Sequence, residues 1–313
     1  SSEELVNALP PIVENLENLL RYDLAVPFLE KAIQYYPEEH ALYDELAYFY
    51  LNSPKIDNGR ALQMQNRALD MDPGNDYYLN NLGWIKLKTG YLNEAEICIR
   101  KALEFDTDNE NYWGNLETLE YMKEHRLNYT QYLLREVGRS EFDELDMLDF
   151  EDQTEACGKY NKDRIEAFKY HLLEKDELNP HEILDKVACL EGFTSTIEQH
   201  RSAEHGPFLF ENPEMFLNPL RLHMVNFIFN SLHIESDYLI EVGKAFGLFY
   251  RYLGEVNLIS PGTAKQFESQ FDSLTNEFSG KLEEYYRLNH DINIDDNERE
   301  ERIDRLFGMF ENQ

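Results

Sequence analysis

The chain has 313 residues, of which 61 are acidic and 29 are basic, and its net charge is −32. This length suits two domains or one solenoid with an extension, and no apolar run approaches the ~20 residues that a membrane-spanning helix needs. A surface this negative repels nucleic acid and anionic membranes and favours basic protein partners, although many acidic proteins are merely well solvated.

Cysteine usage indicates the redox compartment. Cys98, Cys157 and Cys189 are widely spaced and odd in number. This pattern argues against a disulfide framework and for a reducing compartment, so we expect a cytoplasmic protein. The chain begins at Ser1 without a methionine, so a leader segment could have been removed before it.

Small and apolar residues recur at steps of 36 and 34 residues in the first part of the chain. Each unit reads as two short amphipathic helices whose small residues allow a close approach. Leu46, Leu82 and Leu116 recur in the first helix of each hairpin. The second helix repeats Ala25, Leu29, Ala32 and Pro37 as Ala61, Gln65, Ala68 and Pro73, and then as Ala95, Ile99, Ala102 and Thr107.

The best-defined unit runs from Asp76 to Asn109, with a break near Thr89-Gly90. It resembles a tetratricopeptide repeat, whose pattern is W-x2-L-G-x2-Y, then A-x3-F, then P. Such a unit cannot bury its apolar face alone, so the resemblance implies a stacked solenoid of helical hairpins. The matching positions are Leu79 for the Trp, Leu82-Gly83, Lys86 for the Tyr, Ala95, Ile99 for the Phe and Thr107 for the Pro.

A fourth unit begins at Glu110 with Trp113 and Leu116 in register, but its second half, 128–137, lacks the small residues. Terminal units of stacked repeats are often atypical because they cap the array. We therefore expect three repeats and one degenerate capping unit in residues 1–138. Residues 139–160 follow as an acidic connecting segment, which we interpret as a linker or short helix in preference to a pseudo-ligand for a basic groove.

Residues 161–313 are predicted to form an α-helical domain without the repeat's landmarks. No alternating strand pattern occurs, so the fold class is all-α, a TPR-like helical-hairpin solenoid followed by this C-terminal α-helical domain. The first three expected helices are Lys162–Lys175, one from Asn179-Pro180 through Leu190, and one over 219–232 that should be the most buried. The next is capped by Ser236 and has Gly243 and Gly247 at a close crossing. A long helix from Ser260-Pro261 to Asn289 and a final one at about 297–311 complete the domain.

Several stretches approach a metal site but lack a required ligand. His181-Glu182 begins like the zinc-protease motif H-E-x-x-H, but Asp185 replaces the second His. Residues 291–295 space oxygens as a calcium loop does, without the Gly that such a loop requires. His200 and His205 flank a polar turn with no third ligand in the spacing. We therefore expect no catalytic residue, no metal and no cofactor.

The resemblance implies a non-catalytic protein–protein interaction protein, a scaffold or adaptor that binds a peptide or partner helix in a concave groove built from the first helices. Two alternatives remain open. One is a metal-dependent enzyme with its site in the C-terminal helical domain, and the other is an acidic inhibitor or chaperone of a basic protein. The candidate partner-binding residues are Tyr77, Asn80, Asn81, Trp84, Lys88, Tyr112 and Asn115.

Two asparagines suggest how the groove could bind a backbone. Asn81 and Asn115 stand 34 residues apart, which places both amides on one inner face. An amide both donates and accepts, so it can pair with a peptide whatever the peptide's side chains are. The alternative is that each amide merely bonds the backbone of a neighbouring repeat. Lys88 is the one candidate cation on this surface, so we do not expect a receptor for acidic peptide tails.

Overall fold

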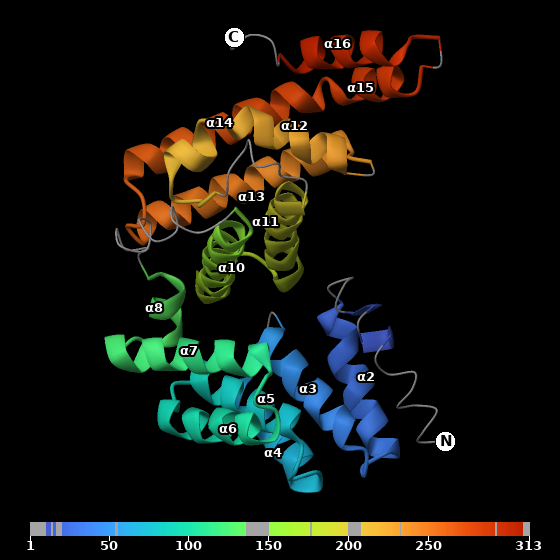
Figure 1. Cartoon of the computed structure of the whole chain (residues 1–313). Helices are drawn as coiled ribbons and strands as arrows, with labels where there is room; N and C mark the ends of the chain where they lie inside the picture. The colour runs from blue at the N-terminus through green and yellow to red at the C-terminus, as the bar shows by residue number, and fades with distance from the viewer. Residues whose placement is uncertain are drawn as a thin grey trace. The chain divides into compact units, whose positions relative to one another are not determined.

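The computed structural model describes residues 11–13, 15–16, 21–53, 56–135, 150–175, 177–199, 208–231, 233–291 and 293–308. Contacts divide the chain into two compact units, Ser1–Leu133 with Leu178–Leu184, and Leu134–Glu177 with Asp185–Gln313. Every regular element in the described ranges is a helix, which confirms the all-α prediction (Figure 1). None of the helices in these ranges is long and apolar enough to cross a membrane.

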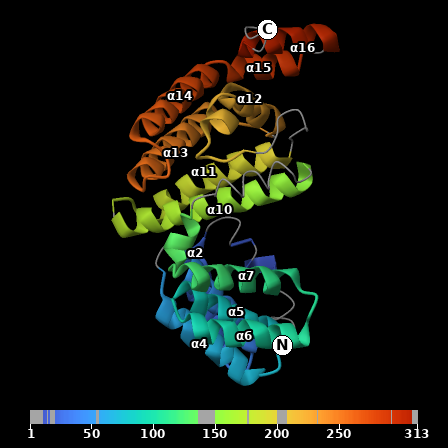
Figure 2. The ribbon, with the colours of Figure 1, turned by 60° about the vertical axis from the view of Figure 1, so that its left-hand side comes forward.

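The first unit is a series of helical hairpins (Figures 1 and 2). Helix α3 packs on α4 and α5 packs on α6, while the contacts of α4 with α5 and of α6 with α7 join successive hairpins. The helices are α2 (Tyr22–Tyr35), α3 (His40–Asn52), α4 (Asn58–Met71), α5 (Asp76–Lys88), α6 (Leu92–Phe105), α7 (Glu110–His125) and α8 (Tyr129–Leu133).

The small residues of the repeat lie where the helices meet. Ala25, Ala61 and Ala95 all have 0% exposed surface. A Cβ atom added at Gly83 would lie 2.6 Å from Cγ1 of Ile99, which is fully buried. Only a glycine at this position therefore lets α5 approach α6 so closely.

The aromatic residue of the fourth unit has a different role from its apolar counterpart. Trp113 is 46% exposed, whereas Leu79 at the same register is buried. The indole Nε1–H of Trp113 donates to the carbonyl of Thr107 at 2.8 Å. Such a bond ties the turn before α7 to the helix itself. The expected second half of this unit is the short helix α8, and residues 136–138 lie outside the described ranges.

The other helices lie mostly in the second unit. Residues 150–160 of the expected connecting segment belong to the first of them, and residues 139–149 lie outside the described ranges. The helices are α10 (Phe150–Lys175), α11 (Pro180–Gln199), the π-helix η1 (Pro213–Leu217), α12 (Leu220–Asn230), α13 (Ser236–Glu255), α14 (Pro261–Ser279), α15 (Leu282–Asn289) and α16 (Asp296–Phe307).

Three expectations for these helices are wrong in detail. The helix predicted to continue to Asn289 ends at Ser279, and α15 begins after a short break. The buried residues Phe278 and Leu282 lie on either side of that break, so the apolar spacing conceals it. Ser236 is the first residue of α13 and not its cap, which is Glu235. The Ser236 hydroxyl instead donates to the carbonyl of Ser279 at 3.1 Å. Helix α11 extends to Gln199, beyond the predicted end.

The core of the second unit is an aromatic cluster centred on α13. The ring centroids of Phe246 and Phe271 are 4.2 Å apart, and those of Tyr250 and Phe267 are 3.8 Å apart. The expected close crossing is at Gly243, where an added Cβ would lie 2.4 Å from a side-chain oxygen of α14. Helix α12, predicted to be the most buried, leaves one of its phenylalanines 37% exposed.

Candidate functional site

Side chains at equivalent positions join the first helices of successive repeats. Between α5 and α7, the hydroxyl of Tyr112 donates to Asp76 Oδ2 and the amide of Asn115 donates to Asn80 Oδ1, each at 3.1 Å. Burial and the bond to Asp76 raise the pKa of Tyr112 to about 12. Tyr112 and Asn80 are 4% and 5% exposed. Tyr112, Asn80 and Asn115 therefore join neighbouring repeats, and the first two leave little surface for the predicted contact with a partner.

The same arrangement occurs one repeat earlier, between α3 and α5. The amide of Asn81 donates to Asp44 Oδ1 at 3.0 Å, and the amide of Gln65 donates to the same oxygen at 2.7 Å. Tyr78 Oη lies 2.7 Å from His40 Nδ1. Each amide bonds a neighbouring repeat, as the second interpretation of the asparagines expected, but that interpretation was wrong about the acceptor. The acceptors are side chains and not the backbone.

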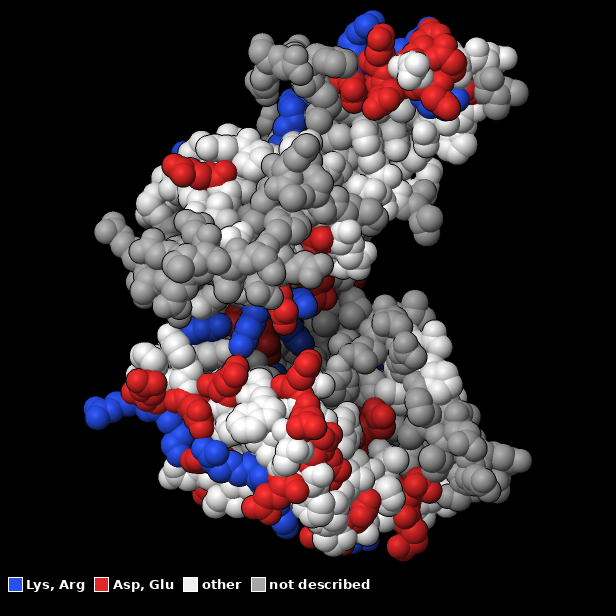
Figure 3. Space-filling model, in the orientation of Figure 1, with Lys and Arg blue, Asp and Glu red and all other residues white. Residues whose placement is uncertain are grey.

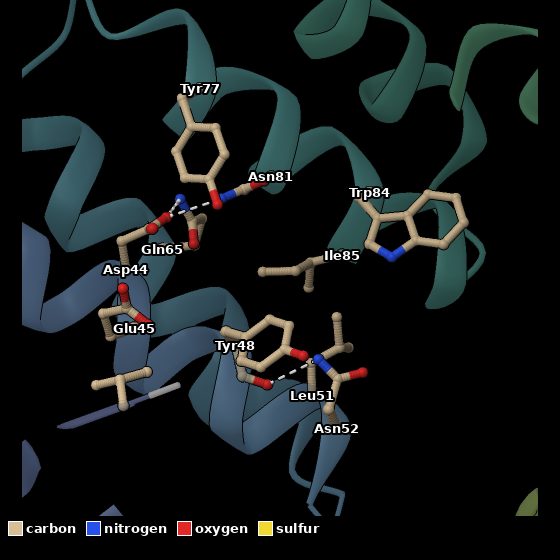
Figure 4. A pocket seen from close by; sticks show the side chains of 11 residues that line it. Asp44, Glu45, Tyr48, Leu51, Asn52, Gln65, Tyr77, Asn81, Trp84 and Ile85 are labelled. Carbon is tan, nitrogen blue, oxygen red and sulfur yellow. Dashed lines mark hydrogen bonds between the residues drawn. The ribbon is translucent and has the colours of Figure 1, made fainter. Parts of the chain in front are cut away.

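An open pocket of about 500 Å³ lies between α3 and α5 in the first unit (Figure 4). Among the predicted partner-binding residues, Tyr77, Asn81 and Trp84 line it, whereas Lys88 does not. The lining consists of Val13, then Asp44, Glu45, Tyr48, Leu51 and Asn52 from α3, Gln65 from α4, and Tyr77, Asn81, Trp84 and Ile85 from α5.

The pocket is acidic at one end and aromatic over much of its wall. Asp44 is 7% exposed and lies beside Asn81, while Trp84 lies at the other side of the space, with Tyr48 and Tyr77 also bordering it (Figure 4). The described residues of the lining include two carboxylates and no lysine or arginine. Figure 3 shows acidic side chains over much of the visible face of the first unit, with basic ones gathered along one edge.

Asp44 is the electrostatic centre of the pocket. Burial raises the pKa of its carboxyl, and the hydrogen bonds from Asn81 and Gln65 offset part of that rise. Both donors are neutral amides, and no lysine or arginine of the described ranges forms an ion pair with Asp44. Burial and the charge of Asp44 also raise the pKa of Tyr78. The carboxylate is therefore solvated mainly by amides, and His40 makes a smaller electrostatic contribution that lowers its pKa.

Lys88, the remaining predicted residue, lies next to the pocket. Its ammonium is 5.8 Å from the ring centroid of Trp84 and 5.1 Å from that of Tyr129. The two rings meet edge to face, with centroids 5.7 Å apart. Lys88 thus makes cation–π contacts that help to place the indole.

Sequence reasoning missed the wall that α3 contributes. Tyr48 stands 36 residues before Trp84, and Asp44 stands 36 residues before Asn80. The repeat spacing itself places each pair at equivalent positions. Applying this spacing to the α5 candidates would have identified both α3 residues.

The stretches that approached metal motifs have structural roles where they are described. Asn179 Oδ1 accepts from the backbone N–H groups of His181 at 3.0 Å and Glu182 at 3.1 Å, which caps α11. Asp291 Oδ1 accepts from the backbone N–H of Asn293 at 2.9 Å. No group of three His, Cys, Asp or Glu residues in the described ranges could hold a metal ion. The pair at 200 and 205 lies outside those ranges.

Comparison with known families supports the repeat. Residues 77–109 match the family model of the tetratricopeptide repeat, which confirms the resemblance over that segment. No curated protein matches the chain. The matched segment contains α6 and nearly all of α5, the helix that carries Tyr77 and Trp84. A repeat of this family suggests a role in protein interaction in general.

Proposed function

We propose that this chain is a non-catalytic interaction protein that binds a peptide or helix of another protein in the pocket between α3 and α5. The observation that carries the proposal is the pocket itself, which combines a buried carboxylate with exposed aromatic side chains on two adjacent repeat helices. Tyr77 is 55% exposed and Tyr48 is 39% exposed. Aromatic side chains that are rigid and partly apolar are common anchors at protein interfaces.

The charge of the pocket supports a basic partner and disfavours an acidic one. Among the residues that the structure describes, its lining contains Asp44 and Glu45 and no base. An acidic peptide tail would place like charges together in a partly buried space, which costs free energy. The net charge of −32 adds a long-range attraction for basic segments. We therefore propose a scaffold or adaptor for a basic segment, and not a receptor for acidic tails.

Affinity capture from a lysate of the source organism tests this function. The bait proteins are the parent, a pocket variant with Tyr77→Ala and Trp84→Ala, and a control variant with Ile97→Ala and Phe105→Ala. The control residues lie on α6, where they are 68% and 58% exposed. We expect a protein that the parent and the control capture and the pocket variant does not. Equal capture by both variants would reject the pocket as the binding site.

The same capture experiment at two salt concentrations distinguishes binding in the pocket from binding by surface charge alone. Contacts with aromatic side chains in a partly buried pocket are screened little by salt, whereas contacts between exposed charges are screened strongly. Capture that survives high salt favours the pocket. Capture that depends on low salt and ignores the pocket variant favours an acidic inhibitor or chaperone that uses its whole surface.

A further inference from the structure

Asp44 is in an unusual position for a carboxylate that only stabilises the stack. At the equivalent junction one repeat later, the acceptor is the neutral amide oxygen of Asn80. A neutral acceptor thus suffices to join two repeats, and the charge of Asp44 adds a desolvation cost to the same bond. Oδ1 of Asp44 accepts from Asn81 and Gln65. No described residue supplies a hydrogen bond to its second oxygen.

The surroundings of that carboxylate suit a large, weakly hydrated cation. Asp44 lines the same pocket as the aromatic rings of Tyr48, Tyr77 and Trp84 (Figure 4). A guanidinium group is planar, donates several hydrogen bonds in one plane and stacks on aromatic faces. Its aliphatic stem needs apolar contacts, which Ile85 offers. An ammonium group is more strongly hydrated, so it loses more on entering such a site.

We propose that the pocket takes an arginine side chain of the partner, with the guanidinium against the Asp44 carboxylate and the stem against the aromatic wall. This inference rests on the proposed function, because it names the residue type that anchors the bound segment. The volume of about 500 Å³ accommodates one long side chain together with its flanking backbone. The charge complementarity between this acidic pocket and a cation selects arginine over neutral or acidic anchors.

Fluorescence of Trp84 supplies a direct measurement. The chain has two tryptophans, so a Trp113→Phe background leaves Trp84 in the pocket as the single reporter. The probes are capped alanine-based pentapeptides whose central residue is arginine, lysine, citrulline or glutamate. Citrulline matches arginine in shape without the charge. We expect the arginine peptide to bind most tightly, the lysine peptide next, and citrulline at least several-fold more weakly than arginine, since hydrogen bonds to ions are the stronger ones.

Two matched variants identify the carboxylate responsible. Asp44→Asn keeps an oxygen that accepts from Asn81 and Gln65 but removes the charge, so the arginine peptide should lose roughly tenfold in affinity or more. Asp76→Asn removes the same charge from another carboxylate that joins two repeats, one that does not line the pocket. It should leave arginine binding unchanged. Thermal unfolding of both variants checks that each remains folded.

The outcomes separate this inference from the proposed function. Equal binding of arginine and citrulline peptides, an arginine preference that survives Asp44→Asn, or no binding of the arginine peptide at millimolar concentration would each overturn the arginine anchor. If partner capture still required Tyr77 and Trp84, the pocket would remain the binding site with another anchor. Capture that ignores those two residues would reject the proposed function itself.

Discussion

Gln65 provides a sharp test of the polar contacts at the base of the pocket. Its register matches Leu29 and Ile99, yet this 1% exposed side chain is an amide. Nε2 donates to Asp44 Oδ1 at 2.7 Å and to the carbonyl of Tyr78 at 3.3 Å. Gln65→Met keeps an unbranched side chain of similar length and removes both bonds.

The expected cost follows from the acceptor. A hydrogen bond to a charged group contributes about 1.5–3 kcal/mol, and removing one partner leaves the buried carboxylate less well solvated. We expect Gln65→Met to lower the free energy of unfolding by about 1.5–3 kcal/mol. This loss is expected even though the methionine is apolar like Leu29 and Ile99, which hold the same position in the other repeats. In an Asp44→Ala background the same change should cost at most about 1 kcal/mol, because the charged acceptor is gone and only the bond to the Tyr78 carbonyl is lost.

Urea unfolding followed by tryptophan fluorescence measures the cost of Gln65→Met with and without Asp44 in the first unit. Both tryptophans, Trp84 and Trp113, lie in the first unit, so the signal reports its unfolding. Gln63→Met is the matched control, since Gln63 lies on the same helix and is exposed, and it should change stability by less than about 0.5 kcal/mol. A Gln65→Met cost that is the same with and without Asp44 would refute the reasoning.

Three further outcomes are expected. In urea unfolding, Gly83→Ala should destabilise the first unit by about 1–2 kcal/mol because its Cβ would meet a buried side chain at 2.6 Å. Gly114→Ala is the control and should stabilise the unit by about 0.5–1 kcal/mol, because its Cβ would have nothing within 4 Å. Burial raises the pKa of Cys189 to about 11, so its alkylation in the native protein, followed by peptide mass spectrometry, should still accelerate above pH 9; a plateau near pH 9 would contradict this. Arg164→Met removes a fully buried guanidinium and leaves the 13% exposed side chain of Glu211 without its partner 2.8 Å away. It should cost about 3 kcal/mol in unfolding followed by circular dichroism, and a loss below about 1 kcal/mol would refute the ion pair.

The repeat could be predicted from the sequence because close helix packing demands small side chains. The alanines at 25, 61 and 95 are fully buried, as their spacing indicated, and the match over 77–109 agrees with that register. Helix ends were less predictable. Periodicity reports which side of a helix is buried, and that side continues through the break between α14 and α15.

The candidate site shows a different limit. Spacing placed Asn81 and Asn115 at equivalent positions but could not say what their amides bond. Their acceptors, Asp44 and Asn80, stand two residues before the recurring leucines of the preceding repeats. The signal for such a contact is a polar residue two positions before the recurring leucine of one repeat and an asparagine one position before the recurring leucine of the next repeat. Such contacts compete with a partner for the same groups, and only three-dimensional placement shows which one forms.

The central claim, that a partner occupies the pocket between α3 and α5, is tested most directly by photocrosslinking at single positions. Benzoylphenylalanine would replace Tyr48 or Tyr77 in the pocket, and Ile97 on α6 as the control, since all three side chains are exposed. After irradiation in a lysate of the source organism, we predict one shared crosslinked protein at both pocket positions and none at Ile97. Equal yields at all three positions, or a product from Ile97 alone, would contradict the claim.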